Sequence, residues 1–545
     1  MAESASKVSS GAVEPHTTID DPKGPPTMHT RALFGLTAHP ITVECHIRQG
    51  LPATTIVGLP EGAVRESRDR VCSALKNSGF DYPNGKVIIN LAPSDITKRS
   101  AALDLPIALS VLVATQQVQS DLINSLEFLG ELGLFGELRA VTGALACAIA
   151  AHQAKRKLVV PKANEEEAQY APRGTLLIAG NLRDVVEGLR DHSIGSFVPT
   201  AENSTYHAAL TRISSTAKRE ELSTAAIFNQ VIGQHAAKRA LTIAAAGGHH
   251  LLMVGPPGTG KTTLARGFCQ LLPPLSPQQS MEVAALYSVA GLTRANHTQA
   301  PFRDPHHSAS ATSLIGGGHP PIPGEVALAN HGVLFLDELP HFKPSALNLL
   351  REPIESGEAV ITRAKYKVRF PCRFQLIAAM NPCPAGRTCS TAACRCTSTQ
   401  LQRYQSRISG PMLDRIDLQV YVPSLPKTLL AQLNQKKASS QAPEHLANSA
   451  VEDVVKARKV QMQRQGNINA LLPAHVLPAH CNTEGIDIRF LEHAVERYAL
   501  SARSVHKIWR IARTIADLDG AQAICPVHFS EALSYRALDW EAGVQ

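Results

Sequence analysis

The chain of 545 residues is poor in aromatic side chains, which make up 5% of it and include two tryptophans. It has no run of the roughly 18 apolar residues that a membrane-spanning helix needs. Its first residues lack the basic start and apolar core of a signal peptide. Its eleven cysteines should be mostly reduced in a chain without an export signal. We therefore expect a cytoplasmic protein with no membrane partner.

The charge of the chain is also modest, since 54 Lys and Arg against 46 Asp and Glu give a formal net charge of +8. Such a charge permits an anionic partner without requiring one, so an argument for nucleic-acid binding must rest on local patches. Apolar residues, at 44%, leave enough material for several cores. The length predicts roughly three or four domains of about 150 residues each.

Polar stretches divide the chain into five expected segments. These are a disordered arm over residues 1–29, an α/β domain over 30–198, a linker rich in Ser and Thr over 199–227, a second α/β domain over 228–425 and a helical region over 426–545. In the first domain, the apolar pattern predicts strands at 86–93 and 157–163 and helices at 100–115 and 143–156.

The strongest motif is GPPGTGKT, residues 255–262, which follows an apolar strand and precedes a helix-like run. Its glycines allow a tight turn whose backbone N–H groups face phosphates, and the helix N-terminus favours the same anions. Lys261 would reach the β- and γ-phosphates, and Thr262 would bind Mg²⁺. The motif therefore predicts ATP and Mg²⁺ as cofactors. The predicted nucleotide contacts are Gly255, Pro256, Pro257, Gly258, Thr259, Gly260, Lys261, Thr262 and Thr263.

An acidic pair, Asp337 and Glu338, follows the apolar strand of HGVLFLDELPHF. Asp337 would support Mg²⁺ and Glu338 would polarise the attacking water, which favours hydrolysis over phosphotransfer. Asn381 ends another apolar strand, and in P-loop ATPases of the AAA+ type a polar residue here senses the γ-phosphate. Arg415 lies between two acids, so it is either part of a local ion pair or a finger that reaches the next subunit of a ring.

Three longer segments carry a resemblance to a known family: PFRDPHHSASATSLIGGGHPPIPGEVALANHGVLFLDELPHF, ISGPMLDRIDL and SARSVHKIWRIARTIADL. They resemble the magnesium-chelatase-like AAA+ ATPases of the ComM/YifB group, from about residue 30 to the end. The resemblance implies a bacterial hexameric ring that acts in branch migration of DNA during natural transformation. It also implies a hydrolytic set, a finger and a sensor arginine on a helical lid: Lys261, Thr262, Asp337, Glu338 and Asn381, then Arg415, then Arg503.

The segment GEAVITRAKYKVRF alternates basic and other residues. Period-two alternation is expected to place Arg363, Lys365, Lys367 and Arg369 on one face of a β ribbon. Hairpins of this family point toward the ring pore, where such a face would contact DNA phosphates. The alternative is an ordinary solvated strand face.

The N-terminal segment GELGLFGELRAVTGALACAIAAHQAKRKLVVPKANEEEA resembles the proteolytic domain of Lon proteases, which use a Ser-Lys dyad. Leu145 stands where the lysine belongs, and the serine of the other half, Ser100, is offset. A serine without a base is a poor nucleophile at neutral pH. The expected fold is therefore an N-terminal Lon-protease-like α/β domain without a catalytic dyad, an AAA+ P-loop α/β domain and a C-terminal helical lid.

The loop over residues 381–396 contains Cys383, Cys389, Cys394 and Cys396, with the spacing C-x5-C-x4-C-x-C. Four thiolates could close a structural tetrahedral Zn²⁺ site that stiffens the loop between Asn381 and the segment of Arg415. The spacing is irregular, so reactive thiols and unliganded loop cysteines remain alternatives.

The leading functional hypothesis is an ATP-driven DNA translocase. The main alternative is a protein-remodelling AAA+ ATPase without a nucleic-acid role, because ATP hydrolysis does not name the substrate. A basic hairpin favours DNA, whereas an aromatic pore loop would favour protein. A porphyrin-metallating motor lacks support, because the nearest string to a D-x-S-x-S metal site has the wrong spacing. Leu145 argues against an ATP-dependent protease.

Overall fold

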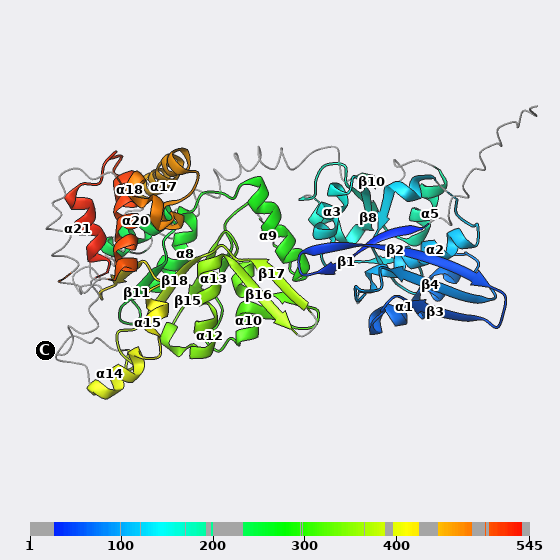
Figure 1. The fold of residues 1–545 in the computed structure, drawn as a ribbon, viewed down its shortest axis with the longest axis horizontal. Coiled ribbons are helices and arrows are strands. Elements are labelled where there is room, and N and C mark those ends of the chain that lie inside the picture. The colour runs from blue at the N-terminus through cyan, green and yellow to red at the C-terminus, as the bar shows by residue number, and fades with distance from the viewer. Residues whose placement is uncertain are drawn as a thin grey trace, which may run out of the picture.

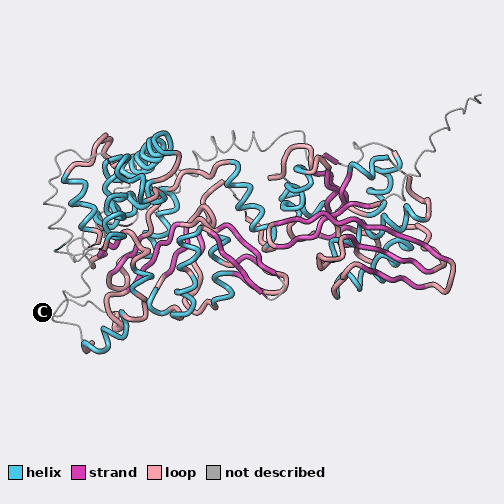
Figure 2. Tube along the Cα trace, viewed as in Figure 1, coloured by secondary structure: helices cyan, strands magenta, loops and turns pink. Residues whose placement is uncertain are grey.

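The computed structural model describes fourteen stretches of the chain: residues 27–98, 100–119, 121–168, 170–191, 198–199, 231, 233–294, 296, 298–363, 366–386, 396–424, 445–481, 496 and 501–536. They form an elongated molecule with an N-terminal lobe at one end and a central lobe joined to C-terminal helices at the other (Figure 1). Figure 2 shows strands in both lobes and a gathering of helices beyond the central lobe. None of the helices in these stretches is long and apolar enough to cross a membrane.

The N-terminal lobe opens with a four-stranded sheet of order β1-β2-β4-β3, in which only the β3–β4 pair is parallel. Its elements are β1 (Met28–Phe34), β2 (Thr37–Arg48), β3 (Ala53–Val57), α1 (Gly62–Asn77), β4 (Lys86–Ala92) and α2 (Asp104–Ala114). The strand and helix predicted at 86–93 and 100–115 are confirmed. The expected disordered arm was drawn two residues too long, because Met28 is fully buried and pairs with Val43.

A second sheet of the lobe has the order β10-β9-β8-β5. The elements of this part are β5 (Leu126–Phe128), β6 (Glu131–Leu132), β7 (Leu138–Arg139), α3 (Ala144–Gln153), β8 (Lys157–Pro161), α4 (Glu165–Ala168), β9 (Leu176–Ala179), α5 (Leu182–Arg190) and β10 (Val198–Pro199). The predicted strand at 157–163 and helix at 143–156 are both present. Strand β10 includes Pro199, which the sequence placed in the linker.

The central lobe is built on a five-stranded, wholly parallel sheet of order β12-β15-β18-β11-β19. Its main elements are α7 (His235–Gly247), β11 (Leu251–Val254), α8 (Lys261–Leu271), α9 (Pro277–Val289), β12 (Phe302–Arg303), β15 (Val333–Leu336), β18 (Gln375–Met380) and β19 (Leu418–Tyr421). Strands β11, β15 and β18 are buried along their whole length, as expected for parallel strands with helices on both faces.

Between these strands the chain makes several excursions. They are α10 (Ala311–Ile315), β13 (Gly316–Gly317), β14 (Ile322–Pro323), α11 (Glu325–Leu328), α12 (Pro344–Leu349), α13 (Arg351–Ser356), β16 (Glu358–Arg363), β17 (Tyr366–Pro371), α14 (Ser398–Gln405) and α15 (Gly410–Leu413). Strands β16 and β17 pair only with each other and form an antiparallel hairpin, called the basic hairpin below.

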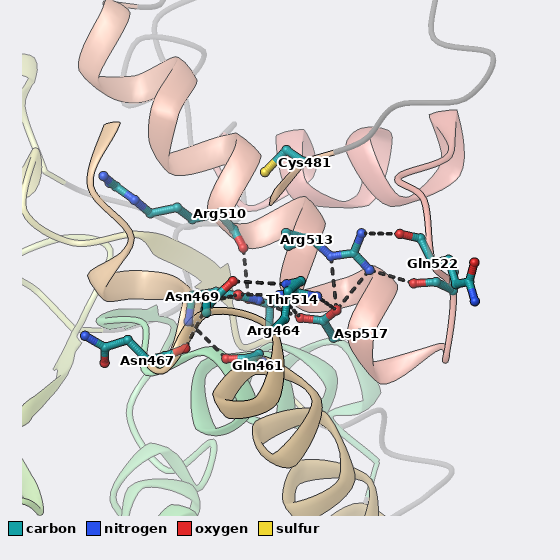
Figure 3. Close-up of polar contacts among 12 residues, drawn as sticks. Gln461, Arg464, Asn467, Asn469, Cys481, Arg510, Arg513, Thr514, Asp517 and Gln522 are labelled. Carbon is teal, nitrogen blue, oxygen red and sulfur yellow. Dashed lines mark hydrogen bonds and ion pairs between the residues drawn. The ribbon is translucent and has the colours of Figure 1, made fainter. Parts of the chain in front are cut away.

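The C-terminal helices are α17 (His445–Gln465), α18 (Leu477–His480), α20 (Ala502–Leu518) and α21 (Pro526–Ser534), as the prediction of a helical region requires. They share one buried apolar cluster with α7, α8 and β11. A polar network lies inside them (Figure 3), where Asp517 accepts hydrogen bonds from Arg464 at 2.6 Å and Arg513 at 3.0 Å. The hydroxyl of Thr514 contacts Asn469 at 3.0 Å and His249, just before β11, at 2.8 Å. The network thus ties the helices to the central sheet.

Candidate nucleotide site

The segment predicted to bind phosphates connects strand β11 to helix α8, so the expected strand–loop–helix context is present. Residues 255–260 are called the phosphate loop below. Gly258 and Gly260 have φ angles of 76° and 87°, a left-handed conformation that favours glycine. A Cβ atom on Gly255 would lie 2.2 Å from the carbonyl oxygen of Val422. The loop conformation therefore requires glycine at these positions.

Lys261 begins helix α8 and is 8% exposed. Its ammonium donates hydrogen bonds to the carbonyls of Gly255, at 2.7 Å, and Pro256, at 2.8 Å, and to Asn381 Oδ1 at 3.3 Å. Burial lowers the pKa of Lys261, and the charges of the Asp337–Glu338 pair oppose that shift. The structure thus brings the predicted Lys261 and Asn381 together beside the phosphate loop.

The residues predicted to support Mg²⁺ are in direct contact, since the Thr262 hydroxyl donates a hydrogen bond to Asp337 Oδ2 at 2.8 Å. Thr262 and Asp337 follow strands β11 and β15, and the carboxyl ends of parallel strands meet at one edge of a sheet. A hydroxyl beside a carboxylate is a hard-oxygen donor pair of the kind that Mg²⁺ takes together with nucleotide phosphates. These two residues therefore fit the cofactor that the sequence predicts.

Glu338 adopts the left-handed region, with φ of 52°, and its side chain is half exposed. Its backbone N–H donates to Asp337 Oδ1 at 2.9 Å, which fixes the acidic pair. A non-glycine residue in this conformation at a site marks backbone strain that the surroundings maintain. Glu338 is thus separated from the Thr262 contact and left available to water.

The loop after Asn381 is tied down by Tyr404 of α14, whose hydroxyl donates to the Asn381 carbonyl at 3.2 Å. Burial raises the pKa of Tyr404 to about 12, so the hydroxyl remains a donor at neutral pH. Sequence reasoning did not single out Tyr404, because a tyrosine 23 positions away carries no local signal.

Two further residues of the site, Asp304 and His307, were also missed. They follow β12, which pairs in parallel with β15, so they arrive at the same sheet edge as the acidic pair. His307 Nδ1 lies 3.5 Å from Glu338 Oε2. Burial, and next the charge of Asp337, raise the pKa of Asp304, and Arg266 opposes this shift from 3.9 Å. A strand of two residues is too short to show periodicity, which is why the sequence did not reveal this position.

Arg415 and Arg503 come together on one residue, Glu355 of α13. Arg415 Nη2 lies 2.8 Å from Glu355 Oε1, and Arg503 hydrogen-bonds to the same oxygen. Partial burial acts to raise the pKa of Glu355, but hydrogen bonds from Arg503 and Arg415 outweigh it and lower the pKa. Arg415 also donates to the carbonyls of Pro411 and Arg351, at 2.6 and 3.3 Å. None of these partners belongs to the phosphate loop or the acidic pair.

The basic hairpin corrects one expectation about its four cationic residues. Its register pairs Arg363 with Tyr366 and Thr362 with Lys367, because the turn falls between 363 and 366. Directly opposed residues share a face. Lys367 and Arg369 therefore lie on one exposed face, whereas Arg363 belongs to the other, which also bears the buried Val368. The prediction of a single basic face was wrong because it ran one alternation through the turn; Lys365 lies outside the described residues.

The cysteine loop is described only in part. Cys383 is buried and Cys396 is half-buried, while Cys389 and Cys394 lie outside the described residues. Within the fourteen described stretches no group of three or more His, Cys, Asp or Glu side chains is placed to hold a metal. The four-cysteine zinc site stays a prediction.

The glycine-bound phosphate loop, the Thr262–Asp337 pair, the acidic Glu338 and the covering C-terminal helices define an AAA+ domain of the magnesium-chelatase type. Three family models match the chain: magnesium chelatase, subunit ChlI, over residues 227–430; subunit ChlI of Mg-chelatase, over residues 43–164; and magnesium chelatase, subunit ChlI C-terminal, over residues 446–536.

Relatives with curated names cover nearly the whole chain. It is 43% identical to the competence protein ComM of Haemophilus influenzae and 44% identical to the uncharacterized protein YifB of Escherichia coli, over 94% of this chain and 97% of each relative. The magnesium-chelatase 38 kDa subunit of Rhodobacter capsulatus is 30% identical over 28% of this chain and 50% of its own length. The chain belongs to the ComM/YifB family of magnesium-chelatase-like AAA+ proteins.

Proposed function

We propose that this chain hydrolyses ATP in a homo-oligomeric ring, most simply a hexamer, and uses the energy to move along DNA and drive branch migration. In the hydrolytic step Lys261 and the phosphate loop hold the β- and γ-phosphates, and Thr262 and Asp337 hold the Mg²⁺ that neutralises their charge. Glu338 accepts the proton of the attacking water. Asn381, already hydrogen-bonded to Lys261, positions the γ-phosphate and that water.

The ring is supported by the pair of arginines on Glu355. Their hydrogen-bond partners lie outside the chain's own phosphate loop, so both guanidinium groups are suited to act on the nucleotide of a neighbouring subunit. Glu355 keeps the two cations side by side without quenching them fully, since half of its surface and of the Arg503 surface faces solvent.

Mixing two inactive variants tests this assignment. A site that takes Lys261 from one subunit and Arg415 from the next recovers activity when Lys261→Ala and Arg415→Ala chains are mixed. About one quarter of the sites in randomly mixed rings contain both intact residues. If Arg415 served its own subunit, the mixture would stay as inactive as its components.

The observation that carries the DNA proposal is the exposed face of the basic hairpin. Lys367 and Arg369 stand on it, and only Arg369 has a carboxylate partner, Glu358 at 3.3 Å, among the described residues. A cationic ribbon without exposed aromatic side chains on that face is suited to track phosphates rather than to grip protein. A relative named competence protein ComM accords with a role in DNA handling. The cytoplasm, where ATP and chromosomal DNA meet, is the expected location.

The test is unwinding of a labelled branched DNA by the purified protein with ATP and Mg²⁺, with Lys261→Ala beside it. The double variant Lys367→Ser/Arg369→Ser should abolish unwinding and lower the slope of DNA affinity against salt by about two contacts. Arg363→Ser is the matched control, because it removes one cation from the opposite face of the same hairpin. Intact ATPase activity without unwinding by the wild type would reject the DNA proposal and favour protein remodelling.

A further inference from the structure

The N-terminal lobe touches the central lobe at one corner, formed by the turn between β1 and β2 and the start of α3. Figure 1 shows this end of β1 next to α9 and to strand β17. The corner makes two separate contacts, one with helix α9 and one with the basic hairpin. Helix α9 follows the phosphate-loop helix α8 directly in the chain, so the two contacts reach both the nucleotide side and the hairpin of the central lobe.

The contact with α9 has an apolar centre. Leu145 of α3 is 1% exposed and forms a small cluster with Ala284 and Ala285 of α9. The small alanines allow the two helices to approach closely. Leu36, in the β1–β2 turn, packs against the same cluster. Leu145 is thus buried by the central lobe and not by the core of its own lobe.

Hydrogen bonds surround this centre and set its register. The backbone N–H of Gly143 donates to the carbonyl of Ser288 at 3.1 Å. The hydroxyl of Ser288, 4% exposed, donates to a carboxylate oxygen of Glu167. The same oxygen accepts the backbone N–H of Leu145 at 3.4 Å, so Glu167 links α3 to α9.

The second contact covers the apolar face of the basic hairpin. Gly35 lies so close to the hairpin that a Cβ atom on it would be 2.4 Å from Val368 Cγ1 and 3.7 Å from the Phe370 ring. Phe34 and Leu36 pack against the buried cluster that contains Val368 and Phe370. Leu36 therefore belongs to both contacts and joins the hairpin to the α9 interface.

We infer that the N-terminal lobe serves as the support of the basic hairpin: it covers the apolar hairpin face, holds the Lys367–Arg369 face outward and ties it to α9. An isolated two-stranded hairpin is at best marginally stable in water. A strand pair that must bear load on DNA consequently needs packing on one face. This inference rests on the proposed function for the meaning of the basic face, but the support itself is a property of the fold.

The residue at position 145 is central to this role. The resemblance to Lon places a catalytic lysine there, and here the position carries an apolar docking contact. A lysine at 145 would put an ammonium group without a described carboxylate partner against two alanines, which is strongly unfavourable. The loss of a protease base and the gain of a docking surface are therefore one and the same substitution.

The test compares Leu145→Lys with Gln153→Lys, which adds the same charge at the exposed end of the same helix. Hydrogen–deuterium exchange by mass spectrometry is followed over residues 283–290 and 358–371 in the full-length protein. Leu145→Lys should raise exchange in both segments about tenfold or more, and Gln153→Lys should leave it unchanged. Basal ATPase activity should stay within about twofold of wild type, while DNA unwinding falls about tenfold or more.

A milder pair keeps the test valid should Leu145→Lys fail to fold. Ser288→Asp places a carboxylate against Glu167, which should undock the lobe, and adding Glu167→Gln should restore docking because the amide can donate to the new carboxylate. Hairpin exchange that stays at the wild-type level in the undocking variants would overturn the inference. So would raised exchange with undiminished unwinding. If the wild type unwinds no DNA, the proposed function fails, and the exchange comparison still decides whether the lobe holds the hairpin.

Discussion

The buried pair of Asp417 and Lys507 supplies the sharpest stability prediction. Lys507 of α20 places its ammonium 2.8 Å from Asp417 Oδ1, and both side chains are about nine-tenths buried. Asp417 Oδ2 accepts the backbone N–H of His250, just before β11, at 3.0 Å. Burial acts to raise the pKa of Asp417, but the charge of Lys507 outweighs it and holds the pKa well below its usual value. One carboxylate therefore joins the C-terminal helices to the strand that precedes the phosphate loop.

Asp417→Asn removes this charge and leaves the buried ammonium of Lys507 with the Asp414 carbonyl as its remaining described partner. Breaking a buried ion pair on one side costs about 3–5 kcal/mol. For a cooperative unit of this size, each kcal/mol lowers the melting temperature by about 2 °C, so the unfolding midpoint should fall by about 6–10 °C. Differential scanning calorimetry measures the shift on the transition of the central lobe and its helices.

Two further variants decide whether the charge itself is responsible. Glu452→Gln breaks the surface pair with Lys456, in which both side chains are more than two-thirds exposed, and should cost at most about 1 kcal/mol. Asp417→Asn/Lys507→Met should recover more than half of the lost stability, because no unpaired charge then remains buried. A drop below about 2 °C for Asp417→Asn, or a double variant no more stable than the single one, would refute the reasoning.

Three other outcomes are expected. His307→Ala should lower kcat for ATP about tenfold with little change in KM, and His307→Asn should retain more activity, because His307 orients Glu338; equal kcat values in all three proteins would remove that role. Burial lowers the pKa of His250 to about 4, and its Nδ1 accepts the N–H of Leu376, so the folded state holds the neutral ring. That contribution is complete above pH ~6.5 and is lost as pH falls toward 4, up to about 3 kcal/mol, so a plot of melting temperature against pH should be flatter for His250→Asn. Finally, elemental analysis should find about one zinc per purified chain and markedly less after Cys383→Ser; metal-free wild-type protein would leave the cysteines as plain thiols.

Much of the nucleotide site was predictable because each part is a local pattern. The phosphate loop needs glycines at set spacing between a strand and a helix, and the structure has them there. Asp337 and Asn381 were found because each ends an apolar strand, and the parallel sheet brings those ends together. Physics that acts over a few neighbouring residues is legible in the chain.

The hairpin shows where such reading stops. Alternation told which residues were basic but not where the turn fell, and a turn between 363 and 366 moves Arg363 to the other face. Strand register depends on which residues pair across the hairpin, so one misplaced turn exchanges the two faces.

The sequence by itself determined the order of the domains, the nucleotide-binding residues and the family to which the chain belongs, since these depend on local spacing. Only the tertiary structure decided that Arg503 shares Glu355 with Arg415, across 148 positions of the chain, and that Leu145 is a docking contact. Neither contact has a local signature. Each arises from the shape of packed surfaces far apart in sequence, and that shape exists only once the lobes have folded and met.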